Sequence, residues 1–148
     1  MKRVLFVDDE KNVLNGLRRM LRSIRDEWEM DFAPGGAEAL ELVGKKEYDL
    51  VVSDMRMPGM DGAELLTKVQ ELSPETVRIV LSGHSEQNMV MKSVKPAHQF
   101  LSKPCSSEQL LQTLKEAYRL RRLLNNPRIK LRYQVSRRSQ ACLTSITG

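Results

Sequence analysis

Acidic, basic and hydroxyl side chains suited to phosphoryl transfer stand at the ends of short apolar runs. They are Asp8 and Asp9 after the first run, Asp54 after the third, Ser82 after the fourth and Lys103 after the fifth. A carboxylate can act as a nucleophile and become an acyl phosphate. Charge on the transferring phosphoryl oxygens is then stabilised by a metal ion and a fixed ammonium group. These residue types therefore indicate phosphoryl transfer to an aspartate, if the fold brings them together.

A divalent cation is expected among the three aspartates. Carboxylates that share one site repel one another and tolerate desolvation poorly unless a cation lies between them. Oxygen ligands with retained water favour Mg²⁺ over softer metals. We therefore predict that Asp8, Asp9 and Asp54 surround Mg²⁺, with Lys103 as the ammonium group and Ser82 as a hydroxyl donor.

Five strands alternating with five helices must position these groups. The apolar runs predict strands at about 4–7, 30–33, 50–52, 77–81 and 99–101. Apolar residues at helical spacing predict helices at about 10–25, 37–43, 63–69, 85–94 and 106–124. Gly44 is expected to close the second helix, and Ser106 with Gln109 forms a capping-box pattern at the start of the last one. This alternation is typical of a doubly wound α/β domain with a parallel sheet. In such a sheet the carboxyl ends of all strands meet at one edge, where ligands bind.

The basic charge of the chain is concentrated at its end. Residues 1–117 contain 16 Lys and Arg against 19 Asp and Glu, whereas residues 118–148 contain 8 Lys and Arg and no acid. Such a tail could contact nucleic acid or a membrane surface. A solvated linker is the favoured interpretation, because the tail lacks a helix-turn-helix pattern and aromatic interleaving. Neither nucleic acid nor a membrane is therefore an expected partner.

The apolar segments and the cysteines predict a cytoplasmic protein. No segment approaches the roughly 18 uncharged apolar residues that a membrane-spanning helix needs. The apolar run at the amino terminus, Val4 to Val7, is too short for a signal peptide. Cys105 and Cys142 show no metal-ligand spacing and are expected to be free thiols.

Four motifs together resemble bacterial two-component response-regulator receiver domains. They are the pair Asp8-Asp9, the run DMRMPGMDG at residues 54–62, Ser82-Gly83 and Lys103-Pro104, and the resemblance covers residues 2 to about 122. The resemblance implies a flavodoxin-like sheet with strand order 2-1-3-4-5. It also implies a receiver domain at 1–122, followed at 123–148 by a flexible basic linker or tail, with the output domain absent.

The resemblance also assigns roles to residues. Asp54 would accept the phosphoryl group from a sensor histidine kinase, and Lys103 would pair with the phosphoryl oxygens. Asp9, Asp54 and the backbone carbonyl of Arg56 would bind Mg²⁺ directly, and Asp8 would act mostly through water. The chain would then be a phosphoacceptor rather than an enzyme, with self-phosphorylation and self-dephosphorylation as its only chemistry.

The implied switch connects this site with a surface. Ser82 would move toward the phosphoryl group, and the aromatic ring of Phe100 would rotate inward behind it. This movement would alter the face made by the fourth helix, the fifth strand and the fifth helix. The altered face would control an output domain or a separate partner, or pair two copies of the chain. The bond between Lys103 and Pro104 would be cis.

Two other functions remain open on the sequence. The first is a pseudo-receiver that only binds proteins, although such a module has no need for the complete acidic and basic set. The second is a phosphohydrolase with an aspartate nucleophile. Those enzymes usually need a second acid close after the nucleophile, and Arg56 occupies that position.

A narrower resemblance concerns the output domain and the lifetime of the acyl phosphate. The segment 96–105, together with the Leu-Ser-Gly-His run at 81–84, is similar to receivers attached to HD-related output domains of the HDOD or HD-GYP type. Arg56 and His84 each lie two residues after a site residue. Both side chains are expected to border the phosphoryl group and to influence its hydrolysis.

Overall fold

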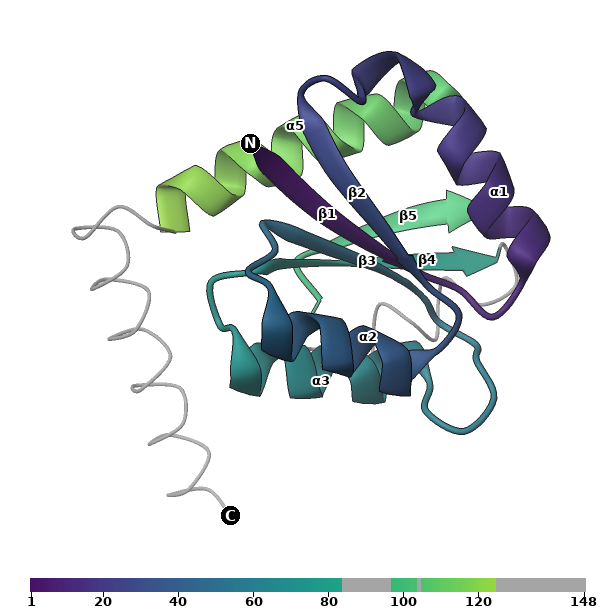
Figure 1. Cartoon of the computed structure of the whole chain (residues 1–148), viewed down its shortest axis with the longest axis vertical. Coiled ribbons are helices and arrows are strands. Elements are labelled where there is room, and N and C mark those ends of the chain that lie inside the picture. Colours follow the sequence, from purple (N-terminus) through teal and green to yellow (C-terminus); the bar gives the residue numbers. More distant parts are fainter. Residues whose placement is uncertain (84–96, 104, 125–148) are drawn as a thin grey trace, which may run out of the picture.

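Short apolar strands form the centre of the molecule, as the sequence predicts (Figure 1). The computed structural model describes residues 1–83, 97–103 and 105–124. The strands are β1 (Lys2–Val7), β2 (Trp28–Ala33), β3 (Leu50–Asp54), β4 (Val77–Gly83) and β5 (Gln99–Lys103). They pair in parallel in the order β2-β1-β3-β4-β5, which confirms the implied strand order.

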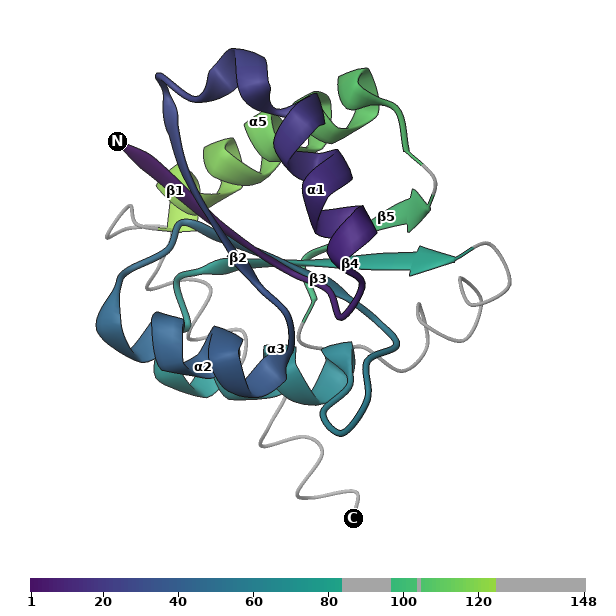
Figure 2. The same ribbon diagram turned by 45° about the vertical axis from the view of Figure 1, so that its right-hand side comes forward.

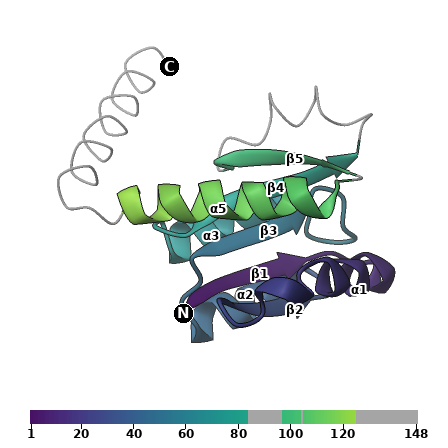
Figure 3. The same cartoon turned by 90° about the horizontal axis from the view of Figure 1, so that it is seen from above.

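Helices cover both faces of this sheet (Figure 2). The described helices are α1 (Lys11–Met20), the short 3-10 helix η1 (Arg22–Ile24), α2 (Gly36–Lys45), α3 (Gly62–Leu72) and α5 (Ser107–Leu124). Helices α1 and α5 lie on one face, and α2 and α3 on the other. Seen from above, α5 runs along β3 and β4 (Figure 3).

Alternation along β1 explains the two layers. Val4 and Phe6 belong to the core cluster under α1 and α5, whereas Leu5 and Val7 belong to the cluster under α2 and α3. Successive side chains of a strand point to opposite faces, so a continuous apolar run is buried on both sides. A short apolar run in the sequence therefore becomes the central, two-sided core of the domain.

Each strand is about two residues longer than predicted, and the ends of helices α1 and α2 differ from the predicted ones. Helix α1 ends at Met20, and the predicted remainder tightens into η1, because apolar residues spaced by three fit either kind of helix. Strand β2 begins earlier, at Trp28. Gly44 does not end α2, since the amide of Lys46 still donates to the carbonyl of Leu42 at 2.9 Å. A glycine costs a helix only about 1 kcal/mol, which is too little to stop it.

The start of α5 confirms a predicted capping box. The amide of Gln109 donates to the hydroxyl of Ser106 at 3.2 Å, and the side chain of Gln109 accepts from the amide of Ser106 at 3.1 Å. The predicted helix at 85–94, His84, Pro104 with its peptide bond, and the tail from 125 onward lie outside the described residues. None of the helices that are described is long and apolar enough to cross a membrane.

A buried arginine attaches the last turn of α5 to the sheet edge opposite the strand ends that carry the acids. The side chain of Arg121 is 4% exposed, and its nitrogens lie 3.1 Å from Glu47, 3.7 Å from Asp49 and 3.5 Å from Glu75. These acids belong to the segments that lead into β3 and β4. Ion pairs from three segments to one guanidinium fix the position of the helix end against the sheet.

Candidate functional site

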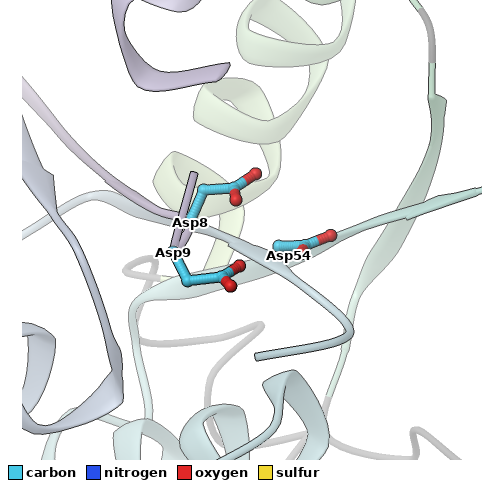
Figure 4. Close-up of side chains that lie close together, drawn as sticks. All are labelled: Asp8, Asp9 and Asp54. Atoms are coloured by element: carbon cyan, nitrogen blue, oxygen red, sulfur yellow. The ribbon is translucent and has the colours of Figure 1, made fainter. Parts of the chain in front are cut away.

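Three aspartates meet at the carboxyl edge of the sheet (Figure 4). Strands β1 and β3 are neighbours, and the pairing of Val7 with Ser53 places the ends of the two strands side by side. Asp8, Asp9 and Asp54 each have a carboxylate oxygen within 4.8 Å of those of the other two. Asp8 and Asp54 are buried, whereas Asp9 is exposed. The sheet therefore brings together the acids that the sequence separates.

The ammonium group of Lys103 bridges two of these acids. Its Nζ atom lies 2.8 Å from Oδ1 of Asp54 and 3.0 Å from Oδ2 of Asp8. Lys103 ends β5, which pairs with β4, so the strand order brings the lysine to the same edge as the acids. One positive charge beside three carboxylates leaves an excess of negative charge when all three are ionised. A divalent cation would neutralise that excess.

The environment shifts the pKa values of the two residues in closest contact. Burial raises the pKa of Asp54 above the ordinary carboxyl value, and the charges of Asp8 and Asp9 act in the same direction, although Lys103 opposes them. Burial acts to lower the pKa of Lys103, but hydrogen bonds to Asp54 and Asp8 raise it overall. The lysine therefore remains an ammonium ion at neutral pH.

Asp8 is held from two directions. Its Oδ1 atom accepts a hydrogen bond from the amide of Glu10 at 3.0 Å, and its Oδ2 atom accepts from Lys103. Its side chain is 1% exposed. Asp9 lies next to it in the sequence but is open to solvent. The two neighbouring acids thus have different environments, one engaged with the protein and one available to a ligand.

The loop after Asp54 is closed by backbone hydrogen bonds. The amide of Met55 donates to the carbonyl of Leu81 at 3.0 Å, and the amide of Gly62 donates back to the carbonyl of Met55 at 2.8 Å. Asp61 caps α3 by accepting from the amide of Glu64 at 2.8 Å. These bonds fix the turn that carries Arg56, whose side chain is exposed.

Gly62 is a positioning residue that the sequence analysis included in a motif without assigning it a role. A Cβ atom at this position would lie 2.4 Å from the carbonyl oxygen of Asp54 and 2.9 Å from the Cα atom of Met55. Both contacts are with backbone, which cannot rotate away as a flexible side chain could. Only a glycine at the start of α3 allows the helix to pack this closely against the end of β3. The signal in the sequence that could have revealed this role is the second glycine of the DMRMPGMDG run, at its end.

We expect the change Gly62→Ala to lower the free energy of unfolding by about 1–3 kcal/mol, because the methyl group must displace backbone. Gly16→Ala is the matched control. Gly16 lies within α1, where a Cβ atom would meet nothing within 4 Å. This control should stabilise the protein by about 0.5–1 kcal/mol. Urea unfolding of both variants and of the wild-type chain measures these changes in the free energy of unfolding. Equal stabilities would show that the close contact at Gly62 has no energetic role.

Ser82 lies on β4, next to β3, and Phe100 lies on β5, the outer strand beside β4. Ser82 follows Leu81, the partner of Asp54 across the β3–β4 pair, and it is buried. Phe100 on β5 is 37% exposed and lines an open hollow of about 510 Å³ between β5 and α5. Phe100 is thus at the surface rather than in the core. The sheet brings Ser82 to the edge that holds the acids, and places Phe100 at its outer strand.

The comparisons with known proteins agree with this geometry. A family profile described as "Response regulator receiver domain" matches residues 4–115. A protein named "Uncharacterized transcriptional regulatory protein YesN" from Bacillus subtilis is 36% identical over an alignment of 123 residues, which covers 78% of this chain and 32% of that protein. The chain thus spans about a third of the length of this curated relative.

Two solved structures show the same fold. The signal receiver domain of an HD domain-containing protein from Pseudomonas fluorescens is 30% identical, with a TM-score of 0.75, over 82% of this chain and 97% of that one. The response regulator TrrA from Thermotoga maritima, solved in complex with Mg²⁺ and BeF, is 31% identical, with a TM-score of 0.70, over 79% of this chain and 99% of that one. Receiver domains of this kind are phosphorylation-dependent switches in two-component signalling. By its profile, its relatives and its fold, the chain belongs to the response-regulator receiver domain family.

Proposed function

We propose that Asp54 accepts the phosphoryl group in this chain and that Mg²⁺ is required. The observation that carries the proposal is the contact of one ammonium group, on Lys103, with both Asp54 and Asp8. An ammonium ion 2.8 Å from the nucleophile's carboxylate is placed to pair with a phosphoryl group formed there. The donor in the cell would be the phosphohistidine of a sensor histidine kinase.

The proposed phosphoryl transfer forms one bond to Asp54 and breaks one bond in the donor. A carboxylate oxygen of Asp54 attacks the phosphorus atom, and the bond between phosphorus and the donor's imidazole nitrogen breaks in line with the attack. The imidazole leaves with the electron pair and takes up a proton. Lys103 pairs with the phosphoryl oxygens, and the buried hydroxyl of Ser82 donates to another of them.

The donor set suits Mg²⁺. Hard carboxylate oxygens at an edge open to solvent are ligands that Mg²⁺ accepts together with retained water. Asp9 is exposed and Asp54 is the nucleophile, so we assign both as direct ligands, joined by the carbonyl of Arg56. Both oxygens of Asp8 already accept hydrogen bonds from the protein, which supports a role through water. Bound Mg²⁺ would neutralise charge on the transferring phosphoryl oxygens.

We also propose how the switch is connected to the rest of its protein. Ser82 and Phe100 would move when Asp54 is phosphorylated. The ring of Phe100, which is partly exposed beside the hollow between β5 and α5, would rotate inward. The receiver unit would comprise residues 1–122, and the linker after it would begin within the last turn of α5, where Leu124 packs against the receiver core. Residues 123–148 would form the linker toward an output domain in the cytoplasm.

The type of output domain is a separate proposal. The similar receiver from an HD domain-containing protein supports the HD-related type. Curated relatives are named transcriptional regulatory proteins, which supports a transcriptional output instead. Either output would be controlled through the surface that includes β5 and α5, and that surface could also pair two receivers.

Incubation of the full chain with acetyl phosphate tests the central proposal. With Mg²⁺ present, intact-mass measurement should show a gain of one phosphoryl group per chain, and chelation of the metal should prevent it. Continuous release of phosphate from a phosphomonoester would indicate a phosphohydrolase instead. If the mass does not increase with acetyl phosphate and Mg²⁺, and no phosphate is released from the phosphomonoester, the chain would be a module that only binds proteins.

Arg56 offers a prediction about the lifetime of the acyl phosphate. Its exposed side chain follows the nucleophile by two residues, so it should restrict the approach of water to the phosphoryl group. We expect Arg56→Ala to change the decay rate after donor removal without abolishing phosphorylation. Lys68→Ala, at an exposed position on α3, is the control. An unchanged decay rate in Arg56→Ala would exclude this role.

A further inference from the structure

A basic hollow lies between the start of β1 and the C-terminal half of α5, away from the acidic site. It has a volume of about 390 Å³ and is lined by Lys2, Lys115, Tyr118, Arg119 and Arg122. The three α5 cations are spaced by four and three residues, so they share one face of the helix. Figure 1 shows the beginning of β1 beside this part of α5. Four positive charges from two elements therefore surround one hollow.

These four cations are not neutralised by acids of the described chain. Within residues 1–83, 97–103 and 105–124, none of the four forms an ion pair with a carboxylate. Arg121 on the same helix shows the contrast, since it is buried among three acids. The helix dipole favours a cation such as Arg122 in the last turn, but it does not explain Lys115 or Lys2.

Aromatic rings hold one of these cations in place. The ammonium group of Lys2 lies 4.8 Å from the centre of the Tyr118 ring and 5.5 Å from that of Trp28. The two rings pack edge to face, with centres 5.8 Å apart. Cation–π contacts restrain the ammonium group but leave its charge uncompensated. The hollow therefore presents one cation restrained by aromatic rings, opposite a row of three exposed ones.

We propose that this hollow binds the phosphate backbone of a nucleic acid, without reading its sequence. The sequence after α5 is also basic, because residues 125–148 contain five Lys and Arg and no acid. An extended series of cations suits an extended polyanion better than a single small anion. An anionic membrane surface also attracts clustered cations. The hollow offers only Tyr118 as a side chain that could insert beside them, so we favour the nucleic acid and make membrane binding an outcome of the test.

The hollow and the phosphorylation site are at opposite edges of the sheet. Lys2 begins β1, and Asp8 follows the end of that strand, which places them about 20 Å apart. A nucleic acid can therefore be bound while Asp54 reacts. The expectation that nucleic acid is not a partner rested on the lack of a recognition pattern, and contact with phosphates alone needs none.

The test is the fluorescence anisotropy of a short labelled DNA duplex of arbitrary sequence, titrated with the full chain at several salt concentrations. The hollow variant combines Lys115→Gln, Arg119→Gln and Arg122→Gln. We expect at least a tenfold loss of affinity and a log–log salt slope smaller by about 3, because roughly 0.9 counterion is released per phosphate contact. A variant with Gln at Arg128, Lys130, Arg132, Arg137 and Arg138 measures the tail's share separately.

Two controls separate the effect of the hollow's charge from the net charge of the protein and from the shape of the arginine side chains. The matched variant combines Arg19→Gln, Lys45→Gln and Lys68→Gln, which removes three exposed charges elsewhere. It should bind DNA within about twofold of wild type. Arg119→Lys with Arg122→Lys keeps the charge and should also retain binding.

Four results would overturn the proposal. They are absence of DNA binding by the wild-type chain, unchanged binding by the hollow variant, an equal loss in the matched variant, and hollow-dependent binding to phosphatidylserine-rich vesicles but not to DNA. The phosphorylation assay is independent of all four, so this inference can fail while the proposed function stands.

Discussion

Asp54→Asn is expected to abolish the Mg²⁺-dependent mass gain with acetyl phosphate. The amide of asparagine has nearly the shape of the carboxylate but is not a nucleophile, so no acyl phosphate can form. Its carbonyl oxygen can still accept a hydrogen bond from Lys103, and the fold should remain intact. Because burial raises the pKa of the Asp54 carboxyl group, removing this charge should not destabilise the protein at neutral pH.

Asp26→Asn is the matched control for this experiment. Asp26 is exposed in the turn before β2, and its replacement removes one carboxylate at the surface. This variant should gain one phosphoryl group as wild type does. If Asp54→Asn still gains mass, another residue is the phosphoryl acceptor, and peptide mapping would then locate it.

Lys103→Met is expected to have the second largest effect. It leaves Asp8, which is 1% exposed, and Asp54 close together without their counterion. Removing one partner of a buried ion pair can cost about 3–5 kcal/mol. Since Lys103 itself is 27% exposed, solvent screening reduces the expected loss of unfolding free energy to about 1–3 kcal/mol.

The same variant should respond more strongly to metal than the wild-type chain does. Without the ammonium group, Mg²⁺ is the remaining cation that can separate the acids, so millimolar Mg²⁺ should recover most of the lost stability. Phosphorylation at saturating Mg²⁺ should still be slower by roughly a hundredfold, because the fixed charge beside the phosphoryl oxygens is gone. Urea unfolding with and without Mg²⁺, and timed mass measurements, test the two effects.

Lys68→Met controls for the loss of a surface charge. Lys68 is exposed on α3, and its replacement should change stability by no more than about 0.5 kcal/mol. Wild-type stability and phosphorylation in Lys103→Met would contradict the assigned role of the lysine. A loss of stability that Mg²⁺ does not recover would show that Lys103 stabilises the fold by packing rather than by charge.

Much of the fold follows from local patterns. Apolar runs such as Val4 to Val7 predicted the strands, and the capping box at Ser106 and Gln109 was confirmed atom by atom. The boundaries were less predictable, because local patterns do not determine backbone pitch. Residues spaced by three could not reveal that α1 tightens after Met20, and Gly44 was compatible with either an ending or a continuing helix.

The sequence by itself determined which residues meet at the carboxyl edge of the sheet. The types of Asp8, Asp9, Asp54 and Lys103, and their places after apolar strands, were sufficient, because parallel strands present their carboxyl ends at one edge whatever the packing details. Residue identity and strand direction are local properties. They can be inferred before any long-range contact is known.

Only the tertiary structure shows the physical difference between chemically identical residues. The family resemblance implied different roles for Asp8 and Asp9, and the fold gives the environments, because one is buried against Lys103 and the other is open to solvent. Arg121 and Arg122 are likewise neighbours, and only the first meets Glu47 and the other acids of the opposite edge. These differences depend on the rotation of a turn or helix relative to the sheet. That rotation is set by contacts between segments far apart in the chain, which no local pattern records.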